Sequence, residues 1–99
     1  MDFQSFKASL SAAAPPPGAS PLLRALWLDA KGDFAGAHAI AQDVDDADGA
    51  SVHAYLHRKE GDLDNAGYWY RRARKPISDE SLSGEWEAIV SALLNVVSH

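Results

Sequence analysis

Two Gly-Asp dipeptides, Gly32-Asp33 and Gly61-Asp62, stand 29 residues apart and constrain the fold more than any other feature. Glycine commonly ends a helix because it adopts the left-handed backbone conformation without a steric penalty. Aspartate commonly begins one because its carboxylate accepts a hydrogen bond from an unpaired N–H group of the first turn. Each dipeptide therefore predicts a tight turn between two helices, and the pair predicts two helix-turn-helix hairpins in succession.

The segments around the two turns also match one another. With a shift of 29 residues, Ala25 aligns with Ala54 and Ala37 aligns with Ala66. These small residues are expected where the two helices of a hairpin approach closely. A single hairpin cannot bury its apolar face alone, so we expect the two hairpins to stack and share a core.

Further helices are expected on both sides of the hairpins. Phe3, Phe6 and Leu10 recur at helical spacing and predict a helix over 2–13, which the prolines of the following APPPG segment end. Near the other end, an apolar stripe predicts a helix that covers the second hairpin; its members are Trp86, Ile89, Val90, Leu93, Leu94 and Val97. Alanine is frequent, and no segment alternates with strand period. The chain is therefore expected to be one all-α domain.

The expected parts of this domain follow from the turn signals. They are an N-terminal helix with a Pro-rich linker (1–19), a first hairpin (20–46), a second hairpin (47–76) and a C-terminal capping helix (77–99). Ser20 followed by Pro21 predicts a helix start. In the second hairpin, the first helix is expected from about Ala50 to Glu60, and the second is expected to end near Pro76.

The segment EGDLDNAGYWYRRA resembles the second half of a tetratricopeptide repeat. In that family a Gly-Asp turn is followed by a small residue five positions after the glycine, an aromatic residue nine after and an alanine twelve after. Gly61, Ala66, Tyr70 and Ala73 match these positions, and Pro76 stands two residues before the family's closing proline. The spacing of 29 residues is shorter than the family's period of about 34.

The resemblance covers residues 20–76, and the whole chain is similar to short bacterial proteins that carry a stretch like HAYLHRKEGDL. Tetratricopeptide folds mostly bind peptides or proteins on a concave helical face. The resemblance thus implies a non-enzymatic scaffold or binding module. Separately, the chain is expected to be a monomer or a weak homodimer. Aromatic and arginine side chains dominate recognition surfaces, so the candidate groove residues are Arg24, His53, Tyr55, His57, Trp69 and Arg72.

His53 and His57 stand one helical turn apart, and three interpretations of them remain open. They are partly buried packing residues bonded to a polar group, or they line the peptide groove, or they bind a metal ion with Glu60 and His38. The first two interpretations need no cofactor. The third gives an alternative function, a small metal- or ligand-binding protein centred on His53 and His57. The repeat register predicts that both rings lean toward the second helix of their own hairpin.

Composition disfavours several classes of partner. A net charge of -5 disfavours nucleic acid and anionic membrane surfaces, which attract cationic proteins. The absence of cysteine excludes disulfides and thiolate chemistry.

Residues 1–20 lack the continuous apolar run of a signal peptide, and no stretch has the length of a membrane span, so a cytoplasmic location is expected. Without a nucleophile or phosphate-loop motif, the chain is not expected to be an enzyme.

Two charged segments have simple interpretations. The segment QDVDDADGA fails as a calcium loop because Val44 and Tyr55 fall where acidic ligands are required, so a solvated acidic turn is expected. The basic cluster RRARK, residues 71–75, complements the negative end of a helix dipole. Pairing between this cluster and the acidic turn is left open.

Overall fold

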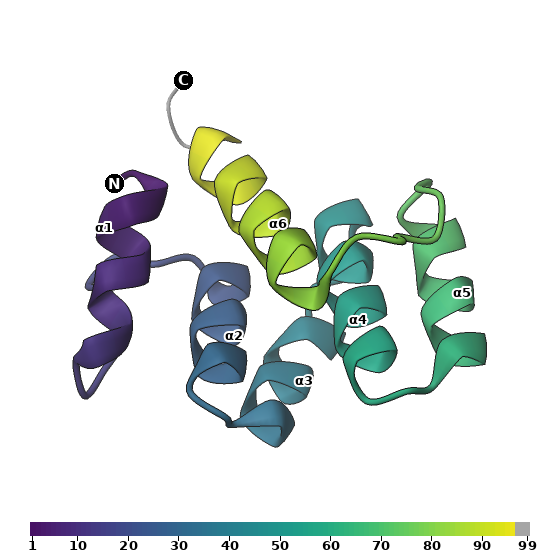
Figure 1. Ribbon diagram of the computed structural model, residues 1–99, viewed down its shortest axis with the longest axis horizontal. Coiled ribbons are helices and arrows are strands. Elements are labelled where there is room, and N and C mark those ends of the chain that lie inside the picture. The colour runs from purple at the N-terminus through teal and green to yellow at the C-terminus, as the bar shows by residue number, and fades with distance from the viewer. Residues whose placement is uncertain (97–99) are drawn as a thin grey trace.

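Helices make up the regular structure of residues 1–96, the part of the chain that the computed structural model describes (Figure 1). In chain order they are α1 (Phe3–Ala8), the short 3₁₀ helix η1 (Ser9–Ser11), α2 (Pro21–Ala30), α3 (Phe34–Gln42), α4 (Ala47–Lys59), α5 (Leu63–Arg72) and α6 (Leu82–Val96). No strand occurs in these 96 residues, which confirms the all-α fold. Among the described helices, none combines the length and apolar character needed to cross a bilayer.

Both Gly-Asp turns form as expected. Gly32 and Gly61 adopt left-handed backbone conformations with φ of 91° and 88°. The carboxylates of Asp33 and Asp62 each accept a hydrogen bond from the N–H group three residues later, at 3.0 and 3.3 Å. The turns therefore join α2 to α3 and α4 to α5, the two predicted hairpins.

Some helix ends differ from the sequence-based expectation. Helix α4 begins at Ala47, three residues before the expected start, because the Asp46 side chain caps it through the Gly49 N–H group at 2.8 Å. Helix α5 ends at Arg72, well before Pro76, and Arg74 then takes a left-handed conformation with φ of 59°. The acidic segment QDVDDADGA thus contains the start of α4.

Small residues allow close packing within the second hairpin. Ala54 of α4 and Ala66 of α5 are fully buried with Tyr70 in one cluster. Helix α4 also joins α1, α2, α3 and α6 in a larger core, whose most deeply buried side chains include Phe6, Leu26, Val52, Leu56 and Val90. The predicted contact at Ala66 is therefore present.

Helix α6 lies across α2 and α4 and also contacts α1 (Figure 1). Its Trp86 donates the indole N–H to the backbone carbonyl of Leu26 at 3.0 Å and contacts the ring of Phe3 at 5.9 Å between centroids. Ile89 and Val90 are buried on the same face. The expectation of a cap over the second hairpin alone is corrected, because this apolar face packs on the first helices of both hairpins.

The C-terminal part of the predicted stripe is less buried than its N-terminal part. Leu93 and Leu94 are only partly buried, although both pack against the core. Val97 lies outside the described residues. The core therefore covers this end of the stripe only in part.

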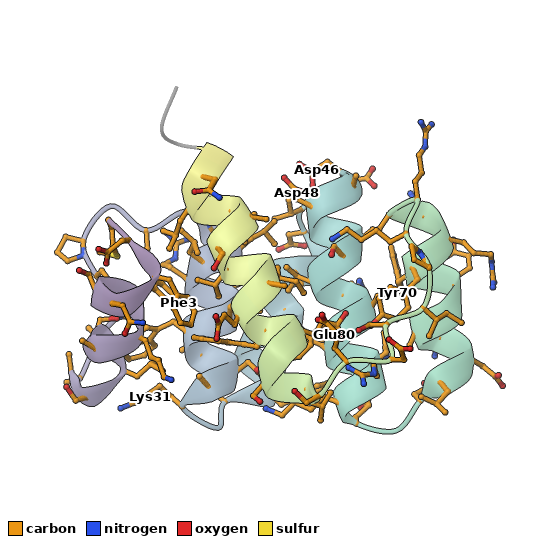
Figure 2. The ribbon with its side chains drawn as sticks, turned by 45° about the horizontal axis from the view of Figure 1, so that its top comes forward. Phe3, Lys31, Asp46, Asp48, Tyr70 and Glu80 are labelled. Atoms are coloured by element: carbon orange, nitrogen blue, oxygen red, sulfur yellow. The ribbon has the colours of Figure 1, made fainter. Side chains whose placement is uncertain are left out.

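A buried carboxylate joins α6 to the second hairpin. Glu85 accepts hydrogen bonds from Arg58 of α4 at 2.8 Å and from the Tyr70 hydroxyl of α5 at 2.6 Å. Arg58 also donates to the backbone carbonyl of Glu80, which lies in the connection before α6 (Figure 2). Burial, together with the Glu85 carboxylate, raises the pKa of Tyr70, so its hydroxyl stays a donor. Three helices thus meet at one side chain.

A second buried carboxylate joins α2 to α4. Asp29 is almost fully buried and accepts hydrogen bonds from the Tyr55 hydroxyl at 3.0 Å and from the Lys59 ammonium at 2.8 Å. Burial and the neighbouring Asp29 raise the pKa of Tyr55. The Tyr55 side chain is therefore occupied inside the fold.

Replacing Glu85 with Ala is expected to lower the free energy of unfolding by about 3–5 kcal/mol, because Arg58 would keep a largely buried charge without its partner. Urea denaturation measures the change. Glu87→Ala, at an exposed position of the same helix, is the control and should change stability by less than about 0.5 kcal/mol. Equal effects of the two changes would contradict the proposed role of Glu85.

Replacing Ala66 with Leu is expected to destabilise the protein by about 1–3 kcal/mol, since the close contact with Ala54 leaves no room for added methyl groups. The control is Ala88→Leu, at an exposed site on α6. Thermal and urea unfolding of both variants test this. A neutral result for Ala66→Leu would mean that α4 and α5 do not meet closely at this point.

Candidate functional site

Three histidine side chains from two helices meet at one place, here named the histidine cluster. His53 and His57 belong to α4, and His38 belongs to α3. The Nε2 atoms of His38 and His53 are 3.0 Å apart, and the three residues offer ring nitrogens that all lie within 4.8 Å of one another. His53 is buried, while His38 and His57 are partly exposed. The cluster therefore has one internal and two accessible members.

The rings of this region form an ordered stack. His53 lies parallel to His57 at 4.8 Å on one side and parallel to Trp69 at 4.0 Å on the other, measured between ring centroids. The guanidinium of Arg72 lies over Trp69 at 5.2 Å, a cation–π arrangement. One face of the His53 ring thus packs on Trp69 of its own hairpin, and the Nε2 atom of the ring points toward α3.

The outer edge of the cluster is held by a carboxylate. Glu60 accepts a hydrogen bond from Nδ1 of His57 at 2.7 Å. The Asp62 carboxylate lies 3.9 Å from the same nitrogen. Hydrogen bonds from Asn65 lower the pKa of Asp62, which caps α5. Glu60 therefore sets the orientation of the His57 ring.

Burial, and to a smaller extent the neighbouring His38 and His57 rings, together lower the pKa of His53 from 6.5 to about 4. A charged imidazole loses its hydration when it is buried and is repelled by other imidazolium groups. His53 is therefore neutral near pH 7 and keeps a lone pair on one ring nitrogen.

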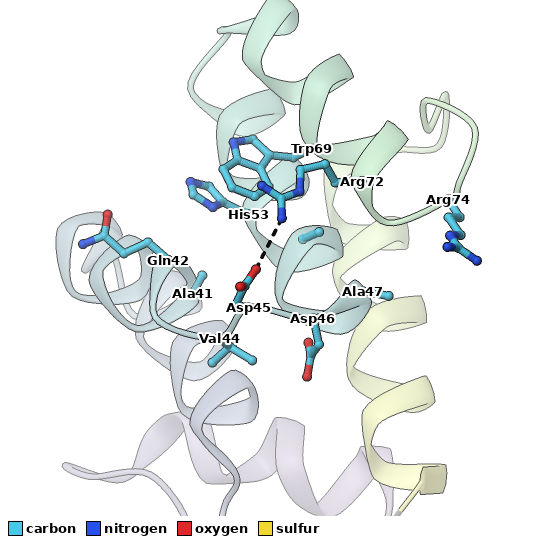
Figure 3. Close-up of a pocket in the computed structure, with 11 residues that line it drawn as sticks. Ala41, Gln42, Val44, Asp45, Asp46, Ala47, His53, Trp69, Arg72 and Arg74 are labelled. Atoms are coloured by element: carbon cyan, nitrogen blue, oxygen red, sulfur yellow. Dashed lines mark hydrogen bonds and ion pairs between the residues drawn. The ribbon is translucent and has the colours of Figure 1, made fainter.

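A recess of about 330 Å³ opens beside the stack (Figure 3). Its walls come from α3, α4, α5 and their connections: Ala41, Gln42, Val44, Asp45, Asp46, Ala47, Ala50, His53, Trp69, Arg72 and Arg74. Arg72 reaches across to Asp45 at 3.3 Å, and both side chains of this ion pair are exposed. We name this hollow the arginine recess.

A second hollow, named the outer recess, lies on the α3 side of the histidine cluster. It has a volume of about 410 Å³ and is lined by His38, Gln42 and Glu60, with Phe34, Ala35 and Ala39. Gln42 lines both hollows. The cluster therefore lies between two surface recesses.

Four of the six candidate groove residues gather here: His53, His57, Trp69 and Arg72. The other two lie elsewhere, which corrects the expectation of one shared groove. Tyr55 is buried and bonded to Asp29, and Arg24 is exposed on α2, where it donates to the backbone carbonyl of Ala19 at 3.2 Å. Tyr55 fails as a groove residue because α6 covers the row of first helices. All four candidate metal ligands (His38, His53, His57 and Glu60) lie together.

Sequence reasoning missed the residues that complete the two recesses, chiefly Gln42 and Asp45. The only signal for Asp45 was its place in the acidic turn, opposite the basic cluster in charge. The Arg72–Asp45 pair is a contact between these two segments, the pairing that the sequence left open. Nothing in the sequence marked Gln42.

Comparisons with protein families, with curated proteins and with solved structures find no match to this chain. The chemistry of the site must therefore be inferred from its own geometry. That geometry offers imidazole nitrogens for a cation, an arginine for an anion and an aromatic wall for apolar groups.

Acidification is expected to destabilise the protein through His53. Unfolded His53 takes up a proton near pH 6.5, whereas folded His53 resists it until about pH 4. Its contribution is therefore complete above pH 6.5 and is lost as the pH falls toward 4, by about 2–3 kcal/mol.

Urea unfolding of the wild type and of His53→Phe across pH 4–7.5 tests this expectation. Both proteins carry the same carboxylates, so the difference between their stability curves reports on the imidazole at position 53. The variant should lose less stability on acidification. Parallel curves for the two proteins would show that His53 titrates normally in the fold.

Proposed function

We propose that the chain is a non-enzymatic binding module that holds a short acidic segment of a partner protein in the arginine recess. The observation that carries the proposal is the Arg72 guanidinium, which lies over Trp69 at the wall of the recess and is paired there with exposed Asp45. Arginine and tryptophan are the side chains most enriched at the energetic centres of interfaces.

The position of the recess follows from the place of α6. In a stack of two hairpins, the row of first helices would offer a binding face, but here α6 packs on α2 and α4. Trp86 and Val90 fill that face with apolar contacts. A partner segment is therefore proposed to bind among α3, α4 and α5 instead.

Arg72 gives the recess a cation that can receive a carboxylate. The Arg72–Asp45 pair is exposed, and such pairs contribute only about 0–1 kcal/mol, so an incoming carboxylate can replace Asp45 at little cost. Arg74 lines the same recess, and both arginines belong to the basic cluster 71–75. Val44, Ala41 and Ala50 add an apolar wall for a neighbouring side chain.

The proposal also includes the finer expectations drawn from the sequence. We propose a tetratricopeptide-like relationship, supported by the two Gly-Asp turns and by the Ala54–Ala66 contact. We also propose that the chain is a cytoplasmic bacterial protein and a monomer or weak dimer. The charge of -5 supports the further proposal that it does not bind nucleic acid.

Selection from a displayed library of random twelve-residue peptides tests the function. Enriched peptides should contain Asp or Glu beside an apolar residue, and their synthetic forms should bind the protein in fluorescence anisotropy. Arg72→Ala should weaken that binding by about tenfold or more, because it removes the cation that receives the carboxylate.

Arg24→Ala is the matched control, since Arg24 is an exposed arginine on α2, outside the recess. It should leave peptide affinity unchanged. If no peptide is enriched, or if both arginine variants bind the selected peptides equally well, the arginine recess is not the binding site.

A further inference from the structure

The histidine cluster has the donor spacing of a transition-metal site. The Nε2 atoms of His38 and His53 are already 3.0 Å apart, and His57 adds a ring nitrogen within 4.8 Å of the donor atoms of the other two. Zn²⁺ binds imidazole nitrogen at about 2.0–2.1 Å in tetrahedral geometry, which places its donors roughly 3.4 Å apart. The His57 ring is stacked on that of His53, so binding requires the His57 ring to turn until its lone pair points at the same ion, a rotamer change of a kind common on binding.

We propose that the cluster is a Zn²⁺ site in which His38, His53 and His57 are the three protein ligands. The ion takes the place of the hydrogen between the two Nε2 atoms, and the ring that carried this hydrogen changes to the tautomer with hydrogen on Nδ1, so that both Nε2 lone pairs face the ion. Three protein ligands leave the fourth tetrahedral position to a water molecule. The site is additional to the peptide site proposed for the arginine recess.

Glu60 supports this arrangement through the Nδ1 atom of His57. It accepts the Nδ1 hydrogen of His57 at 2.7 Å, which leaves Nε2 of that ring as the atom with a lone pair. Histidine ligands of metals commonly have such a carboxylate on their second nitrogen, where it fixes the ring and increases its basicity. Glu60 is therefore assigned as a positioning residue rather than a ligand.

A neighbouring group of donors is a weaker candidate. His57, Glu60 and Asp62 also lie close enough to hold an ion. However, Asp62 already caps α5 and bonds the Asn65 side chain at 2.6 Å. An ion there would have to break the cap, so the three-histidine group is the better site.

Aromatic rings hold two of the ligands before any ion arrives. Trp69 stacks on His53 at 4.0 Å, and Phe34 stacks on His38 at 6.0 Å between centroids. A donor set whose rings are fixed by packing loses little freedom when it binds. The outer recess, lined by His38 and Glu60, gives the ion a path from solvent.

The type of donor selects the class of ion. Imidazole nitrogen suits zinc, nickel and copper, whereas calcium and magnesium require oxygen ligands. Zn²⁺ is assigned because it accepts a tetrahedral site with three protein ligands and water. Nickel and copper are expected to compete for the same nitrogens.

Calorimetric titration of the untagged protein with zinc chloride, after treatment with a chelator, tests the assignment. The wild type should bind one ion per chain, and its melting temperature should rise with zinc. His38→Ala should weaken binding by more than about 100-fold, and Glu60→Gln by about 10–100-fold, as for other residues that orient a ligand. Glu87→Gln, which makes the same change at an exposed position on α6 outside the histidine cluster, should retain the wild-type affinity.

Two further measurements keep the test decisive. If circular dichroism shows that His38→Ala is unfolded, His38→Asn replaces it. Co²⁺ added in place of Zn²⁺ should give the strong visible absorption of a tetrahedral site in the wild type and not in the histidine variant. Arg72→Ala should bind zinc normally, which separates this site from the peptide site. Absence of saturable one-to-one binding, or equal affinity in the histidine variant, would overturn the assignment.

Discussion

The buried carboxylate of Glu85 is the interaction on which the arrangement of the helices depends. A carboxylate removed from water costs several kcal/mol unless charged and polar donors surround it. Here Arg58 and Tyr70 supply those donors from α4 and α5, while Glu85 itself comes from α6. The three helices must therefore keep one relative position to satisfy this side chain, and α6 is directed across α2 and α4.

The position of α6 decides which surfaces are available for binding. Its apolar residues cover the row of first helices, so Tyr55 contacts Asp29 inside the protein. The surface hollows that carry imidazole and guanidinium groups lie among α3, α4 and α5. The same packing that stabilises the core thus covers the row of first helices, where stacked hairpins would offer a binding face. The candidate site therefore lies elsewhere.

His53 is shared by the two proposed sites, but each uses a different part of its ring. The face of the ring packs on Trp69, beside the arginine recess, while the Nε2 edge points to His38. Ring faces provide dispersion and cation–π contacts, whereas ring edges provide lone pairs. Peptide binding and metal binding can therefore be separated by variants that act on only one of these parts, as Arg72 and His38 do.

The sequence by itself determined the local structure. Gly32, Gly61 and the aspartates after them specify turns through backbone conformation and capping, which are interactions between near neighbours. The His53–His57 spacing likewise follows from helix geometry. Only the tertiary structure decided that His38 joins them, that Arg72 meets Asp45, and that α6 crosses both hairpins. These contacts join residues distant in the chain, and they depend on how buried charges such as Glu85 are satisfied when the helices pack, which no local pattern records.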